Sequence, residues 1–436
     1  MSPLAAVNER HDSGIAPGEP DAAEGTDSAV TVPNMSVPDA TVPMEPPTPE
    51  TPMDHCGATI PSGWPGSFTV YAHNPVLTPN PASPSQGNDN IYAPDIHFDG
   101  SVYRMWYGGQ GGDGHDQIFA AWSRDGMAWR VYPTGRTPFP VLPRGSSNHV
   151  NDPSVVRVGN TWRMYYTDAP IGEIDRIWLA ESTNGVTFTK VAQVLDVGPP
   201  GSWDAEKVGR PSVQFDGQTY TMWYDATAAG RRHVGVATSS DGVHFTKYAQ
   251  NPVVENVGAI DVKRVGNGYV LLNEAMDGTH WATSGDGFCW TSRGLLFGLS
   301  GRDYDRYGQV TPHIAMVNGQ VRGIYFGGAS VSTWNRNRIA VALPSGQSDA
   351  GGGCTACAGA GLTCAEACQG AHAGNAGSCA APGSTSGGQC CACASEGCEA
   401  CTGGIDCNTA CVGAGKLGGY CGAPGSTDPG HCCACL

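Results

Sequence analysis

The chain lacks two features that would indicate a membrane or nucleic-acid role. No stretch of 18 consecutive apolar residues occurs in its 436 residues, which argues against a transmembrane helix. Basic residues are few: 24 Lys and Arg stand against 40 Asp and Glu, a formal net charge of −16. Nucleic-acid binding requires a basic face, so we expect no nucleic-acid partner.

The N-terminus also lacks a secretory signal, because MSPLAAVNERHDSG has neither a basic start nor an apolar segment. Residues 1–55 contain no aromatic residue and only one Lys or Arg, Arg10, against ten Asp and Glu. Such a segment cannot bury enough apolar surface to offset its ordering entropy. We interpret it as a disordered acidic leader and expect that the start codon is misassigned or that export is unusual.

Cysteine is scarce before residue 354 and dense after it. Cys56 and Cys289 stand alone, whereas sixteen cysteines lie between Cys354 and Cys435. These sixteen form two eight-cysteine units, which end in CAAPGSTSGGQCCAC and CGAPGSTDPGHCCAC. An even count per unit suits disulfides, which persist in oxidising compartments and can replace a hydrophobic core. We therefore expect an extracellular or cell-surface protein, which the tail attaches to a cell surface or matrix.

What the chain does have is a repeated hairpin. PDIHFDGSVYRMWYGG (from Pro94), PSVVRVGNTWRMYYTD (from Pro153) and PSVQFDGQTYTMWYDA (from Pro211) align without gaps. PHIAMVNGQVRGIYFGG, from Pro312, needs one inserted residue, and a weaker copy begins near Ala259. Each copy is an apolar strand, a tight turn and an aromatic-rich strand, which is typical of a β-hairpin.

A second repeat marks the turn between the third and fourth strand of each unit. Its turn residues Asp125, Asn184, Asp241 and Asp286 are 59, 57 and 45 residues apart, as expected for four-stranded propeller blades. The fifth unit lacks this turn and its outer strand. FTVYAHNPVL from Phe68 matches FTKYAQNPVV from Phe245, the outer strand of the third unit, so we expect the N-terminal strand to complete the fifth blade.

The predicted fold class is therefore all-β: a five-bladed β-propeller closed by an N-terminal strand, followed by a small disulfide-rich C-terminal region. Cys56 precedes the closing strand and Cys289 lies at an outer turn of blade four, so a disulfide between them is expected. The predicted parts are a leader (1–55), the propeller (56–345), a linker (346–353) and two cysteine-rich repeats (354–393 and 394–436).

The hairpins, with their Asp-Pro and Met-Trp-Tyr segments and the closing strand, resemble the five-bladed propellers of glycoside hydrolase families 43, 32 and 130 over about 280 residues. This resemblance implies a carbohydrate partner and cleavage of glycosidic bonds by an acid and a second carboxylate. Asp152 matches the blade-two Asp that holds the sugar, and Glu206 is the candidate acid. Blade one departs from the family because Ala93 precedes the aligned proline, which leaves Asp89, or else Asp95, as the base.

The other candidate sugar contacts come from aligning the blades, since the first strand of a propeller blade lines the channel. They are Asn90, His149, Asp168, Arg210, Asp225, Asp261, Glu274 and His313. Trp203 and Trp334 are candidates for stacking on a sugar ring or for loop packing. No cofactor is expected, although some relatives hold a metal on the axis with a blade-five histidine; a calcium ion beside His313 would correspond to it.

Two alternatives to hydrolysis stay open. The propeller could bind a glycan or surface ligand without cleaving it, which the missing blade-one Asp favours. Phosphorolysis, as in family 130, requires a basic cluster, for which Lys207, Arg210 and Lys263 are the candidates. In each case we expect a monomer.

Overall fold

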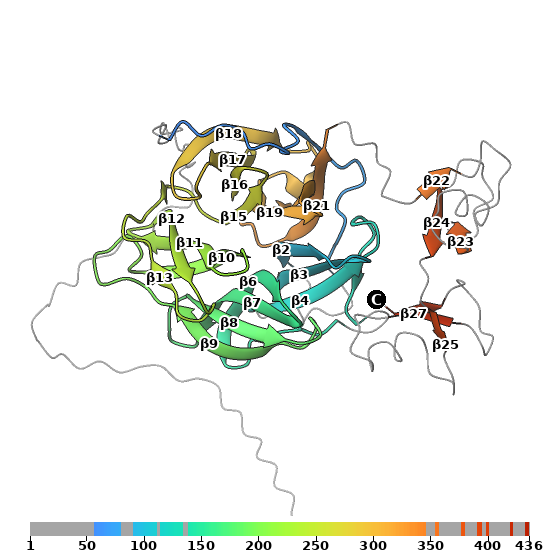
Figure 1. Ribbon diagram of the computed structural model, residues 1–436, viewed down its shortest axis with the longest axis horizontal. Helices are drawn as coiled ribbons and strands as arrows, with labels where there is room; N and C mark the ends of the chain where they lie inside the picture. Colours follow the sequence, from blue (N-terminus) through green and yellow to red (C-terminus); the bar gives the residue numbers. More distant parts are fainter. Residues whose placement is uncertain are drawn as a thin grey trace, which may run out of the picture. The chain divides into compact units, whose positions relative to one another are not determined.

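The computed structural model describes residues 56–79, 90–110, 114–133 and 138–345, and only the backbone of six short strands beyond them. In the first part, antiparallel sheets surround a common axis (Figure 1). The inner strands of neighbouring sheets contact one another around the whole ring. The predicted five-bladed propeller is confirmed.

Each blade runs outward from its inner strand. Blade one consists of β2 (Asn90–Phe98), β3 (Tyr103–Gln110), β4 (Asp116–Ser123) and β5 (Arg130–Val131). Blade two consists of β6 (Ser147–Val158), β7 (Thr161–Pro170), β8 (Arg176–Ser182) and β9 (Thr189–Leu195). Blade three consists of β10 (Lys207–Phe215), β11 (Tyr220–Ala228), β12 (Arg231–Ser239), β13 (Thr246–Lys247) and β14 (Val254–Glu255).

Blade four consists of β15 (Ile260–Val265), β16 (Gly268–Glu274), β17 (Gly278–Ser284) and β18 (Trp290–Gly298). A short 3-10 helix (Asp303–Asp305) leads to blade five, which consists of β19 (Gln309–Val317), β20 (Gln320–Ala329), β21 (Asn337–Pro344) and β1 (Phe68–Val70). β1 pairs antiparallel with β21, with Thr69 opposite Leu343. The N-terminal strand thus closes the ring, as the sequence predicts.

A closed ring of five hydrogen bonds joins the inner strands at the axis. In each blade the side chain that follows the aligned proline, or Ile260 in blade four, accepts a hydrogen bond from a backbone N–H of the next blade. The five acceptor–donor pairs are Asp95–Val155, Ser154–Val213, Ser212–Val262, Asp261–Ile314 and His313–Ile96, at 2.6 to 3.0 Å. We call the five accepting residues the axial ring.

The repeated outer turns are built by their own side chains. In blade one, Asp125 Oδ1 accepts hydrogen bonds from the N–H groups of Met127 and Ala128, and Ser123 Oγ accepts from that of Gly126. Asn184, Asp241 and Asp286 repeat this pattern in blades two to four. These residues form turns, as their position before glycine predicts.

The turn glycines also join neighbouring blades, because each of their carbonyl groups accepts a hydrogen bond from an aromatic side chain of the adjacent blade. The donor–acceptor pairs are Trp106–Gly185, Tyr165–Gly242, Trp223–Gly287 and Tyr325–Gly126, at 2.7 to 2.8 Å. At Gly126 the φ angle is +79°, and a Cβ would lie 2.7 Å from the Tyr325 hydroxyl. Glycine is therefore required there on two grounds.

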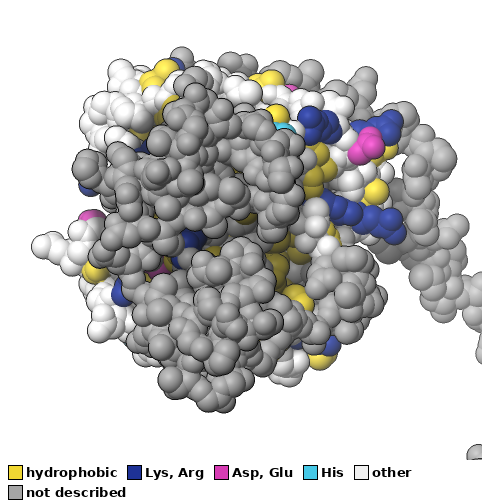
Figure 2. Space-filling model, turned by 90° about the vertical axis from the view of Figure 1, so that its right-hand side faces the viewer, with side chains coloured by type: hydrophobic (Ala, Val, Ile, Leu, Met, Phe, Trp, Pro, Cys, Tyr) yellow, Lys and Arg dark blue, Asp and Glu magenta, His cyan; other side chains and the backbone are white. Residues whose placement is uncertain are grey.

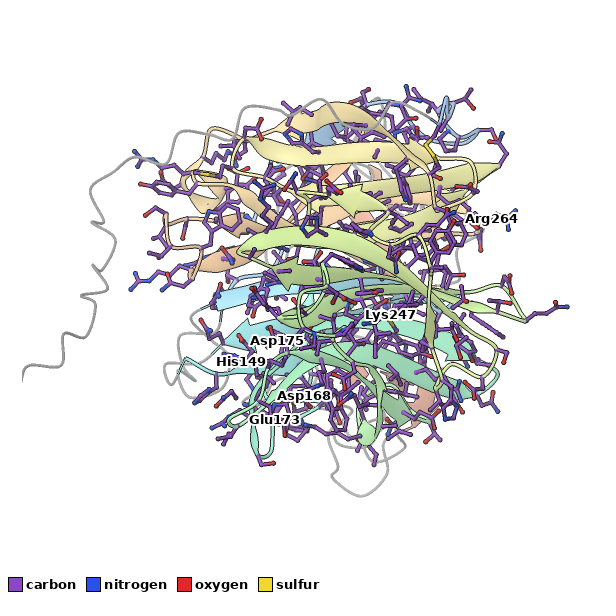
Figure 3. The ribbon with its side chains drawn as sticks, turned by 90° about the vertical axis from the view of Figure 1, so that its left-hand side faces the viewer. His149, Asp168, Glu173, Asp175, Lys247 and Arg264 are labelled. Atoms are coloured by element: carbon purple, nitrogen blue, oxygen red, sulfur yellow. A yellow bond between two sulfur atoms is a disulfide. The ribbon has the colours of Figure 1, made fainter. Side chains whose placement is uncertain are left out.

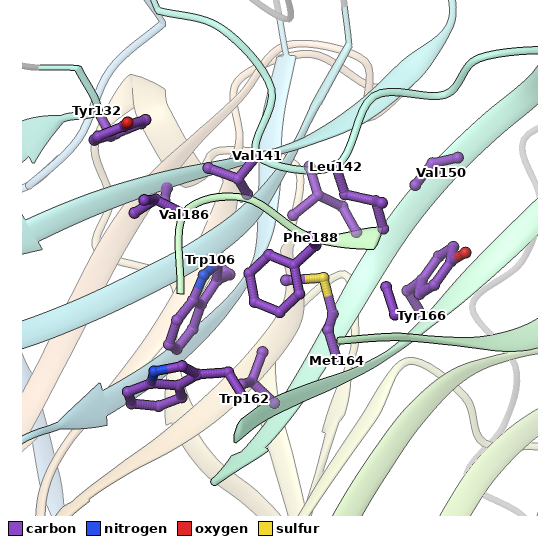
Figure 4. Packing of buried hydrophobic residues seen from close by; sticks show 14 of the residues in the cluster. Trp106, Tyr132, Val141, Leu142, Val150, Trp162, Met164, Tyr166, Val186 and Phe188 are labelled. Carbon is purple, nitrogen blue, oxygen red and sulfur yellow. The ribbon is translucent and has the colours of Figure 1, made fainter. Parts of the chain in front are cut away.

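Large side chains fill the spaces between blades. Between blades one and two, Trp106 packs on Trp162 with ring centroids 5.2 Å apart, and Met164 and Phe188 complete the cluster (Figure 4). Every one of these side chains is almost fully buried. Similar clusters fill the other four junctions, and removing such contacts typically costs several kcal/mol.

The junction between blades four and five lacks a turn hydrogen bond, and the N-terminal segment covers it. Cys56 forms the expected disulfide with Cys289, with Cα atoms 5.7 Å apart. Trp64 then stacks on Trp281 of blade four at 5.4 Å and contacts Phe68 of β1 at 5.2 Å. Segments far apart in the sequence are thus tied together where the ring closes.

In the tail, both cysteine repeats form a three-stranded antiparallel sheet of the same order. The strands are β22 (Cys354–Ala356), β24 (Cys390–Ala394) and β23 (Ala376–Cys379), then β25 (Cys398–Ala400), β27 (Cys432–Cys435) and β26 (Gly419–Cys421). The predicted tail disulfides and the leader lie outside the described residues. Among residues that are described, no helix has the length and apolarity needed to cross a membrane.

On the face shown in Figure 2, the described Lys and Arg side chains gather beside hydrophobic ones, with few Asp or Glu. Much of the acidic excess of the sequence comes instead from residues 1–55, which contain ten Asp and Glu and one basic residue.

We expect Tyr325→Phe to lower the free energy of unfolding by about 1–2 kcal/mol, because the buried Gly126 carbonyl loses its donor. Urea unfolding followed by tryptophan fluorescence measures this change. Tyr248→Phe is the control, since that hydroxyl donates only to Gln250 near the surface, and its effect should stay within about 0.5 kcal/mol. Equal effects of the two substitutions would contradict the proposed importance of the inter-blade hydrogen bond.

Candidate functional site

The mouth of the channel is built from five strained residues, one per blade. Ala93, Asp152, Arg210, Ala259 and Thr311 each precede the aligned proline or its equivalent, and their φ angles are between 45° and 51°. This left-handed region is unfavourable for residues other than glycine, most of all for β-branched Thr. In four blades the pairing register shifts at this point. Strain repeated at one position marks a candidate functional site.

Asp152 is the acidic residue among these five. Its side chain is only 6% exposed; Oδ2 accepts a hydrogen bond from Thr167 Oγ1 at 3.1 Å and lies 3.8 Å from Arg210 Nε. Oδ1 is buried and has no hydrogen-bond partner in the described part of the chain. Burial raises the pKa of Asp152 to about 6, although Arg210 acts to lower it. A carboxylate with such a pKa can exchange protons near neutral pH.

A chain of alternating charges continues from Asp152 around the mouth. Arg210 Nη1 lies 3.5 Å from Asp225 Oδ2, and Arg232 bonds both Asp225, at 2.5 Å, and Glu274. Glu274 also accepts a hydrogen bond from the Thr311 N–H at 3.2 Å. The two arginines are therefore matched by carboxylates, which orders this side of the mouth.

A second polar cluster lies where blades one and two meet. His149 Nδ1 is 2.6 Å from Oδ2 of Asp116, whose side chain is 4% exposed. Asn151 Nδ2 lies 3.4 Å from the same oxygen and donates to Tyr92 Oη at 3.0 Å. The hydrogen bond with Asp116 raises the pKa of His149 despite partial burial.

Asp175 connects the two clusters electrostatically, because its charge raises the pKa of both His149 and Asp152. Figure 3 shows His149, Asp168 and Asp175 at the same end of blade two. Thus Asp152, His149 and Asp175 belong to one face of the propeller.

Other sequence-predicted residues have different surroundings. Asp89 lies outside the described residues. Asp95 belongs to the axial ring, where burial is outweighed by His313 and His97 and the pKa of Asp95 falls to about 2. Glu206 is exposed, and its Oε1 accepts a hydrogen bond from the Ala229 N–H at 2.7 Å. Asp95 and Glu206 thus already have backbone partners, and their proposed catalytic roles stay predictions.

Some of the remaining predicted sugar contacts hold the fold together, and others lie in the polar clusters at the channel mouth. Asn90 accepts a hydrogen bond from the Asn337 N–H at 2.8 Å, and Asp168 pairs with Lys190 at 2.7 Å. Asp261 and His313 belong to the axial ring, and they line the same small axial cavity as Asp152 and Arg210. Of the predicted contacts, Arg210, Asp225, Glu274 and His149 lie in the two polar clusters.

The surroundings of His313 do not fit an axial cation. Its Nε2 accepts a hydrogen bond from the Ile96 N–H, and Lys263 Nζ, 2.7 Å from Asp261 Oδ1, already supplies a positive charge beside the adjacent carboxylate. No group of three or more potential metal ligands occurs within the described ranges. His313 Nδ1 lies 3.3 Å from Asp95 Oδ1 and 3.5 Å from Asp261 Oδ2, so a ring nitrogen occupies the place between two carboxylates where calcium would require free oxygens.

Sequence reasoning missed Asp116, Asp175, Arg232, Tyr92 and Asn151. Asp116 and Arg232 lie on third strands, and Asp175 lies in a loop, whereas the prediction considered the first strand and the end of the second. Asn151 could have been found, since it immediately precedes Asp152 in the NDPS segment.

A separate cleft of about 500 Å³ lies between the outer parts of blades two and three. Trp203, Phe245 and Tyr248 line it, together with Lys247, whose Nζ lies 2.6 Å from buried Asp204. Lys247 is labelled in Figure 3, away from His149. Trp203 also contacts Tyr224, with ring centroids 5.8 Å apart, so it combines a packing role with partial exposure.

With this geometry established, comparison with solved structures shows that the fold is the propeller of glycoside hydrolases. A glycosyl hydrolase from Bacteroides ovatus superimposes with a TM-score of 0.51, at 15% identity, over 65% of this chain and 95% of its own. A family 117 glycoside hydrolase of Zobellia galactanivorans gives 0.50, at 14% identity, over 64% and 90%. A member of family 130, which contains mannoside phosphorylases and hydrolases, gives 0.50, at 16% identity, over 65% and 95%.

At the level of sequence, the chain is similar to two uncharacterized proteins of Mycobacterium tuberculosis, MT1551 and Rv1502. Each is 35% identical over 159 residues, which cover 33% of this chain and 49% of the relative. The match thus spans about half the length of these relatives. No family model matches the chain.

The raised pKa of Asp152 predicts a pH-dependent stability difference. Its folded-state pKa of about 6 exceeds the ordinary value of 3.8, so ionisation costs stability as pH rises through this interval. Between pH 4 and pH 7, wild-type protein should lose about 2 kcal/mol relative to Asp152→Asn. Denaturant unfolding at several pH values measures this difference.

Asp216→Asn provides a control of opposite sign, because backbone hydrogen bonds lower the pKa of this exposed turn residue. It should show no decline of wild-type stability relative to the variant over the same interval. Parallel pH profiles for wild type and Asp152→Asn would contradict the raised pKa.

Proposed function

We propose that this protein is an extracellular glycoside hydrolase-like enzyme that cleaves O-glycosyl bonds of an oligosaccharide or polysaccharide, with Asp152 as the general base. The observation that carries this proposal is the Asp152 carboxyl group, which is buried at the channel mouth on a strained backbone and has one oxygen without a hydrogen-bond donor among the described residues. The glycoside hydrolase fold supports the substrate class.

The chemistry suits a base that acts near neutral pH. Above about pH 6 Asp152 is ionised and can take a proton from a water molecule, and a base is more effective when its pKa is raised toward the operating pH. Arg210 faces the same carboxylate and would hold it in place. Asp225 also has a buried Oδ1 without a hydrogen-bond partner among the described residues. It suits this role less, because its Oδ2 contacts both Arg210 and Arg232 and accepts a hydrogen bond from the Ala259 N–H.

Glycan binding without cleavage is the second candidate. Ala93 occupies the blade-one position at which the resembling families carry Asp, and the separate cleft beside Trp203 offers aromatic rings and paired charges for a sugar. In that case both surfaces would hold a glycan, and the tail would attach the protein outside the cell.

Phosphorolysis receives less support from the basic residues. Arg210 faces Asp152 and Asp225, and Lys263 pairs with Asp261 at 2.7 Å. Lys207 is exposed at the start of β10. A phosphate would have to compete with carboxylates already in contact with two of the three cations.

A screen of the full chain for release of reducing sugar tests the enzymatic proposal. We expect wild-type protein to act on at least one of arabinan, xylan, fructan and mannan, and Asp152→Asn to lower kcat/KM at least 1,000-fold, on the order expected for loss of an essential acid–base group. Assays with and without inorganic phosphate distinguish hydrolysis from phosphorolysis.

Glu206→Gln is the matched comparison, since it tests the acid expected from sequence. If the wild type releases no reducing sugar from any of the four polysaccharides but binds a glycan in affinity electrophoresis, the protein is a glycan-binding propeller and not a hydrolase. Activity that survives Asp152→Asn would contradict the role of Asp152.

The extracellular proposal predicts fully oxidised cysteines in the tail. After purification without reductant and denaturation, thiol titration should detect essentially no free thiol, because sixteen cysteines in two even-numbered units suit complete pairing. Intact mass before and after reduction checks the same point independently. Many free thiols, or a bound metal in stoichiometric amount, would contradict it.

A further inference from the structure

We propose that His149, held by Asp116, is the general acid that protonates the leaving oxygen. This inference rests on the proposed hydrolase function and assigns its second proton-exchanging residue. It gives the role to the junction of blades one and two rather than to Glu206 of blade three.

The contact with Asp116 determines how the imidazole is used. Nδ1 lies 2.6 Å from Asp116 Oδ2, a distance typical of a charge-assisted hydrogen bond in which Nδ1 donates. Nε2 is then the nitrogen left for another partner. With 38% of its side chain exposed, His149 can meet a ligand, whereas Asp116 at 4% cannot.

The pair is held rigidly by backbone and side chains. Asp116 and His149 form the parallel β-bridge that joins β4 of blade one to β6 of blade two. Asn151 approaches the same Asp116 oxygen and also bonds Tyr92 of β2. An acid positioned by three strands can keep one orientation during catalysis.

The two proton-exchanging groups come from one strand. His149 and Asp152 are three residues apart on β6, about 10 Å along an extended chain, and the register shift between Asn151 and Ser154 alters the side-chain alternation there. Inverting glycosidases separate their acid and base by about 6.5–9.5 Å, which leaves room for a water molecule. The spacing along β6 is compatible with that arrangement.

The charges around His149 favour its protonated form. Asp116 is in direct contact, Asp175 and Asp152 act at longer range, and the His115 ring lies 5.9 Å away. Glu206 lacks an equivalent setting: it is exposed, and a backbone N–H occupies one of its oxygens. An imidazolium beside an ionised Asp152 supplies an acid and a base in the same pH range.

The reaction balances as a single displacement. His149 Nε2 gives its proton to the glycosidic oxygen while the bond between that oxygen and the anomeric carbon breaks. A water oxygen attacks the anomeric carbon, and Asp152 takes one proton from this water. Neutral imidazole and a protonated carboxyl remain; Asp152 then loses its proton to solvent and His149 gains one, which restores both groups.

The test compares substrates that need an acid with substrates that do not. The probes are the polysaccharide that the wild type cleaves and the 2,4-dinitrophenyl glycoside of the same sugar, whose leaving group departs without protonation. We expect His149→Gln to lower kcat/KM on the polysaccharide at least 100-fold and on the aryl glycoside less than 5-fold. The alkaline limb of the pH profile should disappear in this variant.

Asp116→Asn tests the positioning role, and we expect it to move the alkaline limb to lower pH because the imidazolium loses its partner charge. His244→Gln is the matched control, because His244 lies 2.7 Å from Asp241 in an exposed outer turn. This substitution should leave kcat/KM unchanged on both substrates.

The outcomes separate the two proposals. An inactive wild type would overturn the hydrolase function itself. An active wild type with equal losses on both substrates in His149→Gln would overturn only the acid role of His149. If Glu206→Gln instead shows the selective loss on polysaccharide, Glu206 is the acid.

Discussion

The axial ring is the constraint on which the rest of the propeller depends. Five side chains at one position of the inner strands each accept a hydrogen bond from a backbone N–H of the following blade. His313 of blade five closes the ring by accepting from the Ile96 N–H of blade one. Two of these acceptors are Asp, two are Ser and one is His. The blades therefore share a hydrogen-bond acceptor at this position rather than one residue type. Because the ring holds the residue after each proline, the residue before it enters the channel mouth in a strained conformation.

At the outer part of the propeller, the junction between blades four and five differs from the other four junctions. Four junctions have an aromatic donor on a turn glycine, but blade five lacks the turn and blade four carries Leu272 where the other blades carry Trp or Tyr. The N-terminal segment compensates through the Cys56–Cys289 disulfide, Trp64 and β1. In this closure β1 pairs with the edge of β21 and links the N-terminal part of the propeller to its last strand.

The sequence predicts most of the fold because hairpins, Asn/Asp-Gly turns and the closing strand are local patterns that repeat. It also identifies Asp152, Arg210 and His149 by alignment to the prolines. The sequence could not show that Asp95 and His313 hold the axial ring together rather than contact a substrate. The register shift beside each strained residue interrupts the regular alternation of side chains between the two faces of the strand. Asp116 and Arg232 come from third strands, and their approach to the mouth depends on the packing of adjacent blades rather than on any repeat.

The charge pattern at the channel mouth supports the proposal that the proton-exchanging residues lie on blade two rather than on blade one. Arg210 and Arg232 engage Asp225 and Glu274, so those carboxylates order the arginines and are less available to a substrate. Asp152 and Asp225 each have one buried oxygen without a hydrogen-bond partner among the described residues, but Asp225 contacts both arginines. His149 keeps the ring nitrogen that faces away from Asp116. Asp152 and His149 both belong to β6, next to the blade that carries Ala93. The proposed mechanism therefore needs no carboxylate at the Ala93 position, because it assigns the second proton to the junction of blades one and two.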